Sequence, residues 1–339
     1  MSSNVQNGEK MFDYYLNFPP EIRTEVIKEM RPDDKCRFTR CSKLCSEEVR
    51  KSDGYIQGLQ FFWFLSENRI QISVHFHSKQ EKEIMGFNLT FREKNQKKYI
   101  EYEKSVSTSG VLWSVDLASF TNIVQLGFEY FEQYILEYQR TIRRLTLCGT
   151  NDGYFSVNSL NKLEELTVDN HREFLHYTSK MKRPLKRAIR YTTKNKLLPL
   201  KCKNLFQLYE VQEYFYAPDI RMDYEHFLKF SAKAIAIHIG KLTPIDLSNF
   251  IKSWQNGTIC KGFIFCQFTL DHSRFKVQQF FEYLNLEYNG SESVEFEIKH
   301  NIEAGKVAKL DYSRAGHWKR ITFDARDETN DNHLRNYGF

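Results

Sequence analysis

The sequence has few of the residues that mark several large protein classes. Its 339 residues include only 15 Gly and 7 Pro, which argues against Gly-rich phosphate loops and turn-rich sandwiches. The 7 Cys are odd in number and form no paired CxxC motif, so we expect a reducing compartment rather than a disulfide framework. The most apolar run, Leu59–Leu65, is far shorter than the ~20 residues that a membrane helix needs, so no membrane association is expected.

Sequence motifs of common enzymes are lacking as well. The patterns GxGxxG, GxxxxGKS/T, HExxH and GxSxG do not occur. We therefore assign no catalytic residue, expect no cofactor and predict that the chain is not an enzyme. The N-terminal stretch MSSNVQNGEKMFDYYLNFPPE has no apolar core of the kind found in signal peptides. The expected location is the cytoplasm, the nucleus or both.

The sequence contains two groups of potential metal ligands, and neither predicts a metal site. Cys36, Cys41 and Cys45 are spaced i, i+5, i+9, but no nearby His supplies a fourth ligand. Small buried hydrophobes are the better interpretation of these thiols. His75 and His77 stand two apart on one strand face and could bind zinc, but no Cys, Asp or Glu motif accompanies them. A solvated strand face explains them better.

The residues that are plentiful favour a packed protein. Apolar residues make up 41% of the chain and aromatic residues 15%, which is ample for a hydrophobic core. The formal net charge of +6 is mild for this length, so it permits acidic partners without requiring nucleic acid.

One basic stretch supports an alternative function. Ser179–Lys203 holds ten Lys and Arg residues and no Asp or Glu, as in a surface that binds nucleic acid or another polyanion. The competing interpretation is a solvated face with a nuclear-import-like cluster at Lys180–Arg187. Tyr191 is the one aromatic residue in the stretch, which disfavours a stacking platform for single strands. Nucleic acid is therefore not the expected partner.

The N-terminal part is predicted to be a small helical module at 14–52 after a flexible segment at 1–13. Pro19 and Pro20 followed by Glu21 favour a helix start. Ile22, Val26, Ile27 and Met30 then fall on one helical face. Pro32 ends that helix, and the Cys-containing stretch that follows forms a second. Modules below about 40 residues rarely hold a core alone, so part of the apolar face should be left for a partner.

The segment 53–325 is predicted to be a larger α/β domain. Alternating strands at Ile70–His77, Gly86–Phe91 and Lys98–Glu103 indicate a three-stranded antiparallel meander. Short strand-like pieces then recur 20 to 29 residues apart, a spacing typical of leucine-rich repeats. These pieces are RRLTL (143–147), LEELTV (163–168), KRAIRY (186–191), FQLYEV (206–211), AIAIHI (234–239) and FIFCQF (263–268).

The end of this domain shows the clearest local signals. Thr243 as N-cap, Pro244 and Asp246 predict the start of a helix, and Gly257 its left-handed end. With its flanking strands, this helix forms a parallel β-α-β crossover. VEFEIKH (294–300), VAKLDY (307–312) and RITFDA (320–325) are expected to form a closing meander, followed by a flexible tail at 326–339. The predicted fold is thus α+β or α/β: a small helical module, then a leucine-rich-repeat-like domain.

The residues 18–45, FPPEIRTEVIKEMRPDDKCRFTRCSKLC, resemble the F-box. This resemblance implies that the N-terminal module is a three-helix F-box. Family members typically read LPxEI, then aliphatic residues, P-x-D and a V-C-K/R segment. Phe18–Ile22 corresponds to the opening, Pro32–Asp34 to the loop and Cys41–Leu44 to the later segment. The chain departs from the pattern at Cys36, where Leu is usual, and in having no Trp near Cys45.

A second segment, Tyr224–Gly257, is similar to the F-box-associated domain of the large nematode-type F-box family. The family run reads FLKxxAKxIxI, then LTxxDLNxFIKxWxxG. The matching positions are Phe227, Leu228, Lys229, Ala232, Leu242, Thr243, Leu247, Phe250, Ile251, Trp254 and Gly257.

Together, the two resemblances imply a substrate-recruiting adaptor of a Skp–cullin–F-box ubiquitin ligase. Such proteins bind the Skp subunit through the F-box and a target protein through the C-terminal domain, while other subunits carry the chemistry. The residues expected to face or organise the Skp adaptor are Phe18, Pro19, Pro20, Ile22, Val26, Ile27, Met30 and Phe38. Some of these must pack the module's own core, and the sequence does not separate the two roles.

Overall fold

The structure is a computed structural model of the 339-residue chain. It describes residues 15, 17–30, 34–35, 38, 41–51, 55–77, 84–104, 111–117, 122–132, 141–150, 155, 162–181, 183–191, 198–199, 208–221, 224–238, 242–258, 263–271, 275–315 and 318–325. The segments predicted to be flexible, 1–13 and 326–339, lie outside the described residues. The chain divides into two compact units, Met1–Leu163 and Glu164–Phe339, and each is considered by itself.

Unit 1 begins with a helical segment. Helix α2 spans Pro20–Glu29, with Pro19 as N-cap and Glu21 in its first turn, and helix α4 spans Lys43–Lys51. Both helices contribute to a small core in which Tyr15, Ile27 and Val49 are buried, with Met30 and Phe38 packed against it.

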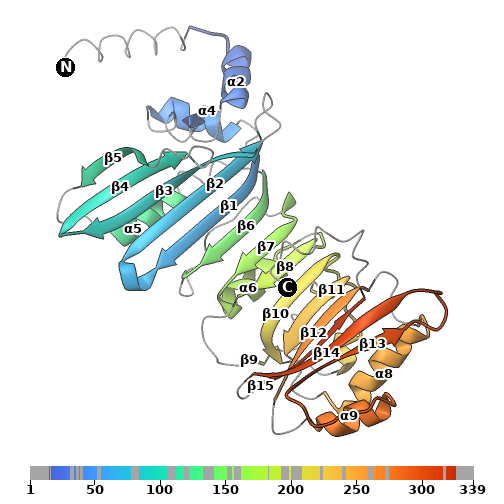
Figure 1. The fold of residues 1–339 in the computed structure, drawn as a ribbon. Coiled ribbons are helices and arrows are strands. Elements are labelled where there is room, and N and C mark those ends of the chain that lie inside the picture. Colours follow the sequence, from blue (N-terminus) through green and yellow to red (C-terminus); the bar gives the residue numbers. More distant parts are fainter. Residues whose placement is uncertain are drawn as a thin grey trace. The chain divides into compact units, whose positions relative to one another are not determined.

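The rest of unit 1 is built on one sheet with the order β6-β1-β2-β3-β4-β5 (Figure 1). Its strands are β1 Tyr55–Phe64, β2 Arg69–His77, β3 Ile84–Lys94, β4 Lys97–Lys104, β5 Val111–Leu117 and β6 Thr141–Cys148. The turn between β1 and β2 contains a short 3-10 helix, Leu65–Glu67. Neighbours from β1 to β5 are antiparallel, which confirms the predicted meander, whereas β6 lies parallel to β1.

An aromatic cluster forms part of the core of unit 1. Helix α5, Ile123–Glu129, has Asn122 as its N-cap, whose side chain accepts from the Gln125 N–H. The Phe61 ring from β1 lies 4.9 Å from Phe128, 4.8 Å from Phe131 and 5.2 Å from Phe155. Aromatic pairs at such separations pack favourably beyond the area that they bury.

Unit 2 is built on a second run of strands, in the order β7-β8-β10-β11-β12-β15-β14-β13, with the short β9 beside β10 (Figure 1). The bounds are β7 Glu165–Val168, β8 Arg187–Arg190, β9 Leu198–Pro199, β10 Tyr214–Arg221, β11 Ala234–His238, β12 Phe265–Asp271, β13 Ser293–Lys299, β14 Val307–Ala315 and β15 Trp318–Asp324. Neighbours from β7 to β12 are parallel, and those from β12 through β15 and β14 to β13 are antiparallel.

The helices of unit 2 are α6 His171–Ser179, α7 Tyr224–Phe227, α8 Pro244–Gln255 and α9 Val277–Tyr283. The predicted start of α8 is confirmed. The Asp246 N–H donates to Thr243 Oγ1 at 3.2 Å, and the Thr243 N–H donates to Asp246 Oδ2 at 3.1 Å. Gly257 follows the helix with φ of 66°, as predicted. The β11-α8-β12 crossover is likewise parallel, and the closing meander is antiparallel as expected.

Helix α8 is held against the sheet by aromatic residues. The Phe250 ring lies 5.1 Å from Phe227 and 5.8 Å from Phe268 on β12, and the Trp254 ring lies 5.0 Å from Phe323 on β15. Helices α8 and α9 also contact each other, and Ser248 Oγ donates to the Phe280 carbonyl at 3.2 Å.

The predicted architecture, a three-helix F-box followed by a leucine-rich-repeat-like α/β domain, is wrong. The structure is mainly sheet, in which parallel and antiparallel neighbours are mixed. A regular spacing of strand-like pieces does not determine how the strands pair, and antiparallel meanders supply strands in both units.

One of the expected strands is also misplaced. Residues 208–210 of the piece at 206–211 form a turn, and the strand of this region is Tyr214–Arg221. Leu208 and Val211 are buried, so these apolar residues mark a buried turn region and not a strand. None of the helices in the described parts of the chain has the length and apolar character needed to cross a membrane.

Candidate functional site

Among the described residues, helix α2 carries both buried and exposed apolar side chains. Ile27 is fully buried in the small core of unit 1. Phe18, Ile22 and Val26 are 46%, 48% and 38% exposed. Because residues four apart lie above one another on a helix, Ile22 and Val26 share one exposed side of α2, and Phe18 precedes the N-cap Pro19. We call Phe18, Ile22 and Val26 the α2 stripe.

The buried side of α2 is fixed by contacts that hold the helix in one orientation. The Arg23 Nε atom lies 3.0 Å from Glu48 Oε1 on α4, and both side chains are largely buried. The Tyr15 hydroxyl donates to Glu48 Oε2 at 2.6 Å, and its ring lies 5.0 Å from Phe38. Burial, and then the hydrogen bond to Glu48, raise the pKa of Tyr15 well above its usual value. Ile22 and Val26 of the α2 stripe are therefore presented from an anchored helix.

The expected adaptor-binding residues fall into two groups. Phe18, Pro19, Pro20, Ile22 and Val26 are exposed. Ile27 is buried, and Met30 and Phe38 are partly buried against the same core. The structure thus distinguishes residues that can touch a partner from residues that pack the helical segment, which the sequence left open.

Helix α4 adds one exposed apolar side chain that was not among the expected site residues. Leu44 is 39% exposed, whereas Cys45 and Val49 on the same helix are buried. The Cys45 N–H donates to Ser42 Oγ at 3.1 Å at the start of the helix, and burial raises the pKa of the Cys45 thiol. Leu44 belongs to the stretch that resembles the later F-box segment, so the resemblance could have indicated it.

The described part of the basic stretch holds several cations that are paired or buried. Lys186 Nζ lies 2.9 Å from Glu164 Oε2. The Arg187 guanidinium lies 3.2 Å from Glu165 Oε1 and 3.1 Å from Glu213 Oε2, and Arg190 is buried. Residues 182, 192–197 and 200–203 of this stretch lie outside the described residues. Polyanion binding by the stretch stays a prediction.

The candidate metal ligands differ in exposure where the structure describes them. Cys41 is exposed, Cys45 is buried, and Cys36 lies outside the described residues. Burial, and then the nearby Arg144, lower the pKa of His75, and the side chain of His77 is not described. Among the residues that are described, no three His, Cys, Asp or Glu side chains gather as metal ligands.

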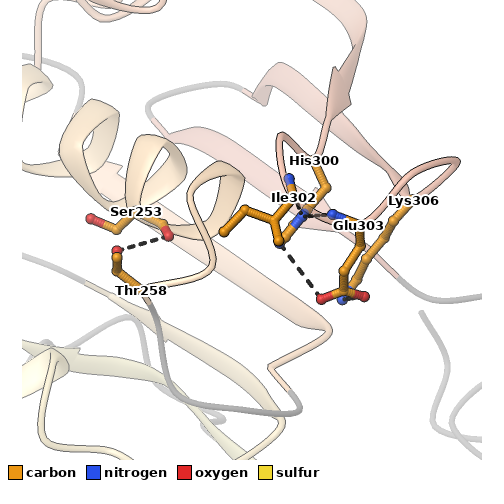
Figure 2. Close-up of polar contacts among 6 residues, drawn as sticks. All are labelled: Ser253, Thr258, His300, Ile302, Glu303 and Lys306. Carbon is orange, nitrogen blue, oxygen red and sulfur yellow. Dashed lines mark hydrogen bonds and ion pairs between the residues drawn. The ribbon is translucent and has the colours of Figure 1, made fainter.

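The turn between β13 and β14 in unit 2 is held by several side-chain contacts (Figure 2). His300 Nδ1 accepts from the backbone N–H groups of Ile302, at 3.3 Å, and Glu303, at 2.9 Å. The His300 ring stands edge-on to Trp254 at 4.9 Å, and Lys306 Nζ lies 3.0 Å from Glu303 Oε2.

This ordered turn leaves the side chain of Ile302 70% exposed. The turn is also joined to the end of α8, because the Asn301 N–H donates to the Gln255 carbonyl at 2.8 Å. Next to it, the backbone N–H and Oγ1 of Thr258 both donate to the Ser253 carbonyl, at 2.9 and 3.0 Å. The turn is thus a fixed element that ends the outer strand β13.

Comparisons of the chain with protein-family models, with curated proteins and with solved structures find no match.

Proposed function

We propose that the chain is a substrate-recruiting adaptor of a Skp–cullin–F-box ubiquitin ligase. In this proposal the helical segment Tyr15–Lys51 binds the Skp subunit, and the sheet-containing parts bind a target protein. The proposal rests on the resemblance of residues 18–45 to the F-box. The observation that supports it best is the α2 stripe, which coincides with the first half of that resemblance.

The α2 stripe has the chemistry that a helical partner surface needs. Burying an apolar side chain of this size stabilises a complex by about 1.5–3 kcal/mol, so three such side chains can form the centre of an interface. The opposite side of the helix is already fixed by the Arg23–Glu48 ion pair and by Ile27. Binding of a partner should therefore cost little conformational entropy in α2.

In such a complex this chain would contribute proximity rather than chemistry. Holding a target close to the charged ubiquitin carrier raises the effective concentration of the reacting groups, while catalytic residues belong to other subunits. The cytoplasm and the nucleus are the proposed locations, since cullin-based ligases act there.

The proposal is tested by co-expression of the full chain with the Skp adaptor, followed by affinity purification. Ile22→Asp with Val26→Asp places two charges in the α2 stripe. Since both side chains are exposed, the fold should tolerate the change. The loss of apolar burial and the cost of burying a carboxylate should weaken binding more than about 100-fold. The variant should therefore fail to co-purify the adaptor.

The matched control is Leu228→Asp with Ile302→Asp, which changes two exposed apolar residues of unit 2 in the same way. This control should retain the adaptor. If the wild-type chain does not co-purify the adaptor, or if the α2 variant binds as well as the control, the proposed function is wrong.

A further inference from the structure

Strand β13 forms one edge of the sheet in unit 2. Its seven residues pair with β14 in a continuous antiparallel register, from Ser293 opposite Ser313 to Lys299 opposite Val307, with no bulge. Within the part of the chain that the structure describes, no strand pairs with its other side. A regular, unpaired edge offers backbone groups to an added strand unless something blocks it.

The hydrogen bonds at the two ends of β13 show which backbone groups face outward. The Arg314 N–H donates to the Glu292 carbonyl, and the His300 N–H donates to the Lys306 carbonyl. Even-numbered residues of the strand therefore turn their main-chain groups toward β14. The odd-numbered residues Ser293, Glu295 and Glu297 turn theirs outward, because the two directions alternate along an antiparallel strand.

One end of this edge is already closed. The Gln255 side chain at the end of α8 donates to the Lys299 carbonyl at 3.4 Å, and the Asn301 N–H donates to the Gln255 carbonyl at 2.8 Å. The open part of the edge therefore runs from Ser293 to Glu297. This length suits the addition of a short extended peptide, a common mode of peptide recognition.

The side chains of β13 give the edge two different faces. Val294 and Phe296 are half-buried on the helix side, where the Phe296 ring lies 5.0 Å from Phe281 of α9. Glu295 and Glu297 are exposed on the opposite face. Lys309 Nζ lies 3.7 Å from Glu295 Oε1. Among the described residues, Glu297 has no ion pair.

The charges on this edge argue against pairing with a second copy of the chain. Two β13 edges joined in antiparallel fashion about Phe296 would place Glu295 of one copy opposite Glu297 of the other. Like charges directly opposite one another destabilise a strand pair. A basic strand would instead place opposite charges across the new pair.

We propose that the β13 edge binds an extended peptide in which Lys or Arg alternates with apolar residues. The basic side chains would lie opposite Glu295 and Glu297, and the apolar side chains would extend the row of Val294 and Phe296. The chain as a whole carries a net charge of +6, so attraction for such a peptide is local to this edge. The inference stands whether or not the α2 stripe binds the Skp adaptor.

The test uses the full chain and a fluorescein-labelled octapeptide of alternating Lys and Val, with binding followed by fluorescence anisotropy. A peptide of the same composition with all Lys before all Val is the control for charge alone. A version with N-methylated amides at alternate positions removes half of the backbone donors. The alternating peptide should bind, and both control peptides should bind at least about tenfold more weakly.

Two protein variants complete the test. Glu295→Gln with Glu297→Gln should weaken binding of the alternating peptide about tenfold, since two exposed charge pairs are lost. Glu282→Gln with Glu287→Gln removes the same charge from other exposed positions and should leave binding unchanged. Equal binding of the block peptide, or an unchanged affinity of the first variant, would overturn the proposal. A wild-type dimer that sedimentation detects at micromolar concentration and that Glu297→Pro abolishes, because the outward N–H is removed, would also overturn it, in favour of self-pairing.

Discussion

Gly149 follows β6 directly, with φ of 81°, and its backbone passes close to β1. A Cβ at this position would lie 2.3 Å from the Trp63 carbonyl oxygen, which is main chain and cannot move aside. Gly290 in unit 2 has nearly the same φ, 83°, but a Cβ there would meet nothing within 4 Å. Substitutions at the two glycines therefore distinguish two effects on stability. One is the strain of a left-handed backbone, which both positions share, and the other is the steric clash with β1, which occurs only at Gly149.

We predict that Gly149→Ala destabilises the protein more than Gly290→Ala. Both substitutions should cost about 1–2 kcal/mol from the left-handed conformation. Gly149→Ala should cost a further 1–3 kcal/mol or so, because the chain must shift to relieve the clash. Urea unfolding of each variant measures the difference. Equal losses would mean that β1 and β6 do not approach each other as described.

Asp311 lies on β14 opposite Glu295 of β13. Partial burial, and then the nearby Glu295, raise the pKa of Asp311. A raised pKa means that folding favours the protonated carboxyl. The stability that the protonated Asp311 carboxyl contributes is therefore fully present below the unfolded-state pKa of about 3.9. It is lost as the pH rises through the folded-state pKa of Asp311. At neutral pH the ionised Asp311 therefore slightly destabilises unit 2.

Asp311→Asn should accordingly increase the free energy of unfolding at pH 7, by up to about 1 kcal/mol. The gain should shrink as the pH falls toward 3. Chemical unfolding at several pH values measures it. Combining the change with Glu295→Gln should give less than the sum of the two single effects, because both relieve one repulsion. A gain that is equal at pH 3 and pH 7 would exclude a charge effect.

At the scale of single elements, α8 is the helix whose limits the sequence predicted best. Thr243 and Asp246 satisfy each other's backbone N–H groups at its start, and Gly257 follows its end. These signals depend on neighbouring residues in the chain, so they can be recognised without knowledge of the fold. The turn at Leu208–Glu210 shows the opposite case, since its apolar residues are buried by tertiary packing that local sequence does not reveal.

We predict that Thr243→Ala destabilises unit 2 by about 1 kcal/mol, because the Asp246 N–H loses its acceptor. Thr243→Ser keeps the hydroxyl and is the matched control, with a loss of a few tenths of a kcal/mol at most. Thermal unfolding of both variants measures the effect. Equal stabilities of the Ala and Ser variants would show that the capping box contributes little.

At the scale of the whole molecule, the sequence predicted local strand pairs but not the order of the strands. The meander from β2 to β4 and the closing meander follow from short connections and alternating residues. The pairing of Tyr55 with Thr141 in β1 and β6 joins residues far apart in the sequence, as does that of Phe265 with Asp324 in β12 and β15. Side-chain alternation shows which residues are buried, but not which distant strand lies alongside.

The candidate surfaces could be predicted only in part for the same reason. Helical spacing placed Ile22, Val26 and Ile27 on one broad apolar face, yet Ile27 is buried and its two neighbours are exposed. The difference depends on Tyr15 and Val49, which come from outside α2. The open edge of β13 depends on strand order, which no local pattern contains.

The proposed partner of the α2 stripe is the Skp adaptor. The most direct measurement is calorimetric titration of the purified adaptor into the full chain, with the Ile22→Asp and Val26→Asp variant measured alongside. We expect saturable one-to-one binding by the wild-type chain and no detectable heat of binding for the variant. No binding by the wild-type chain, or equal affinities of the two proteins, would contradict it.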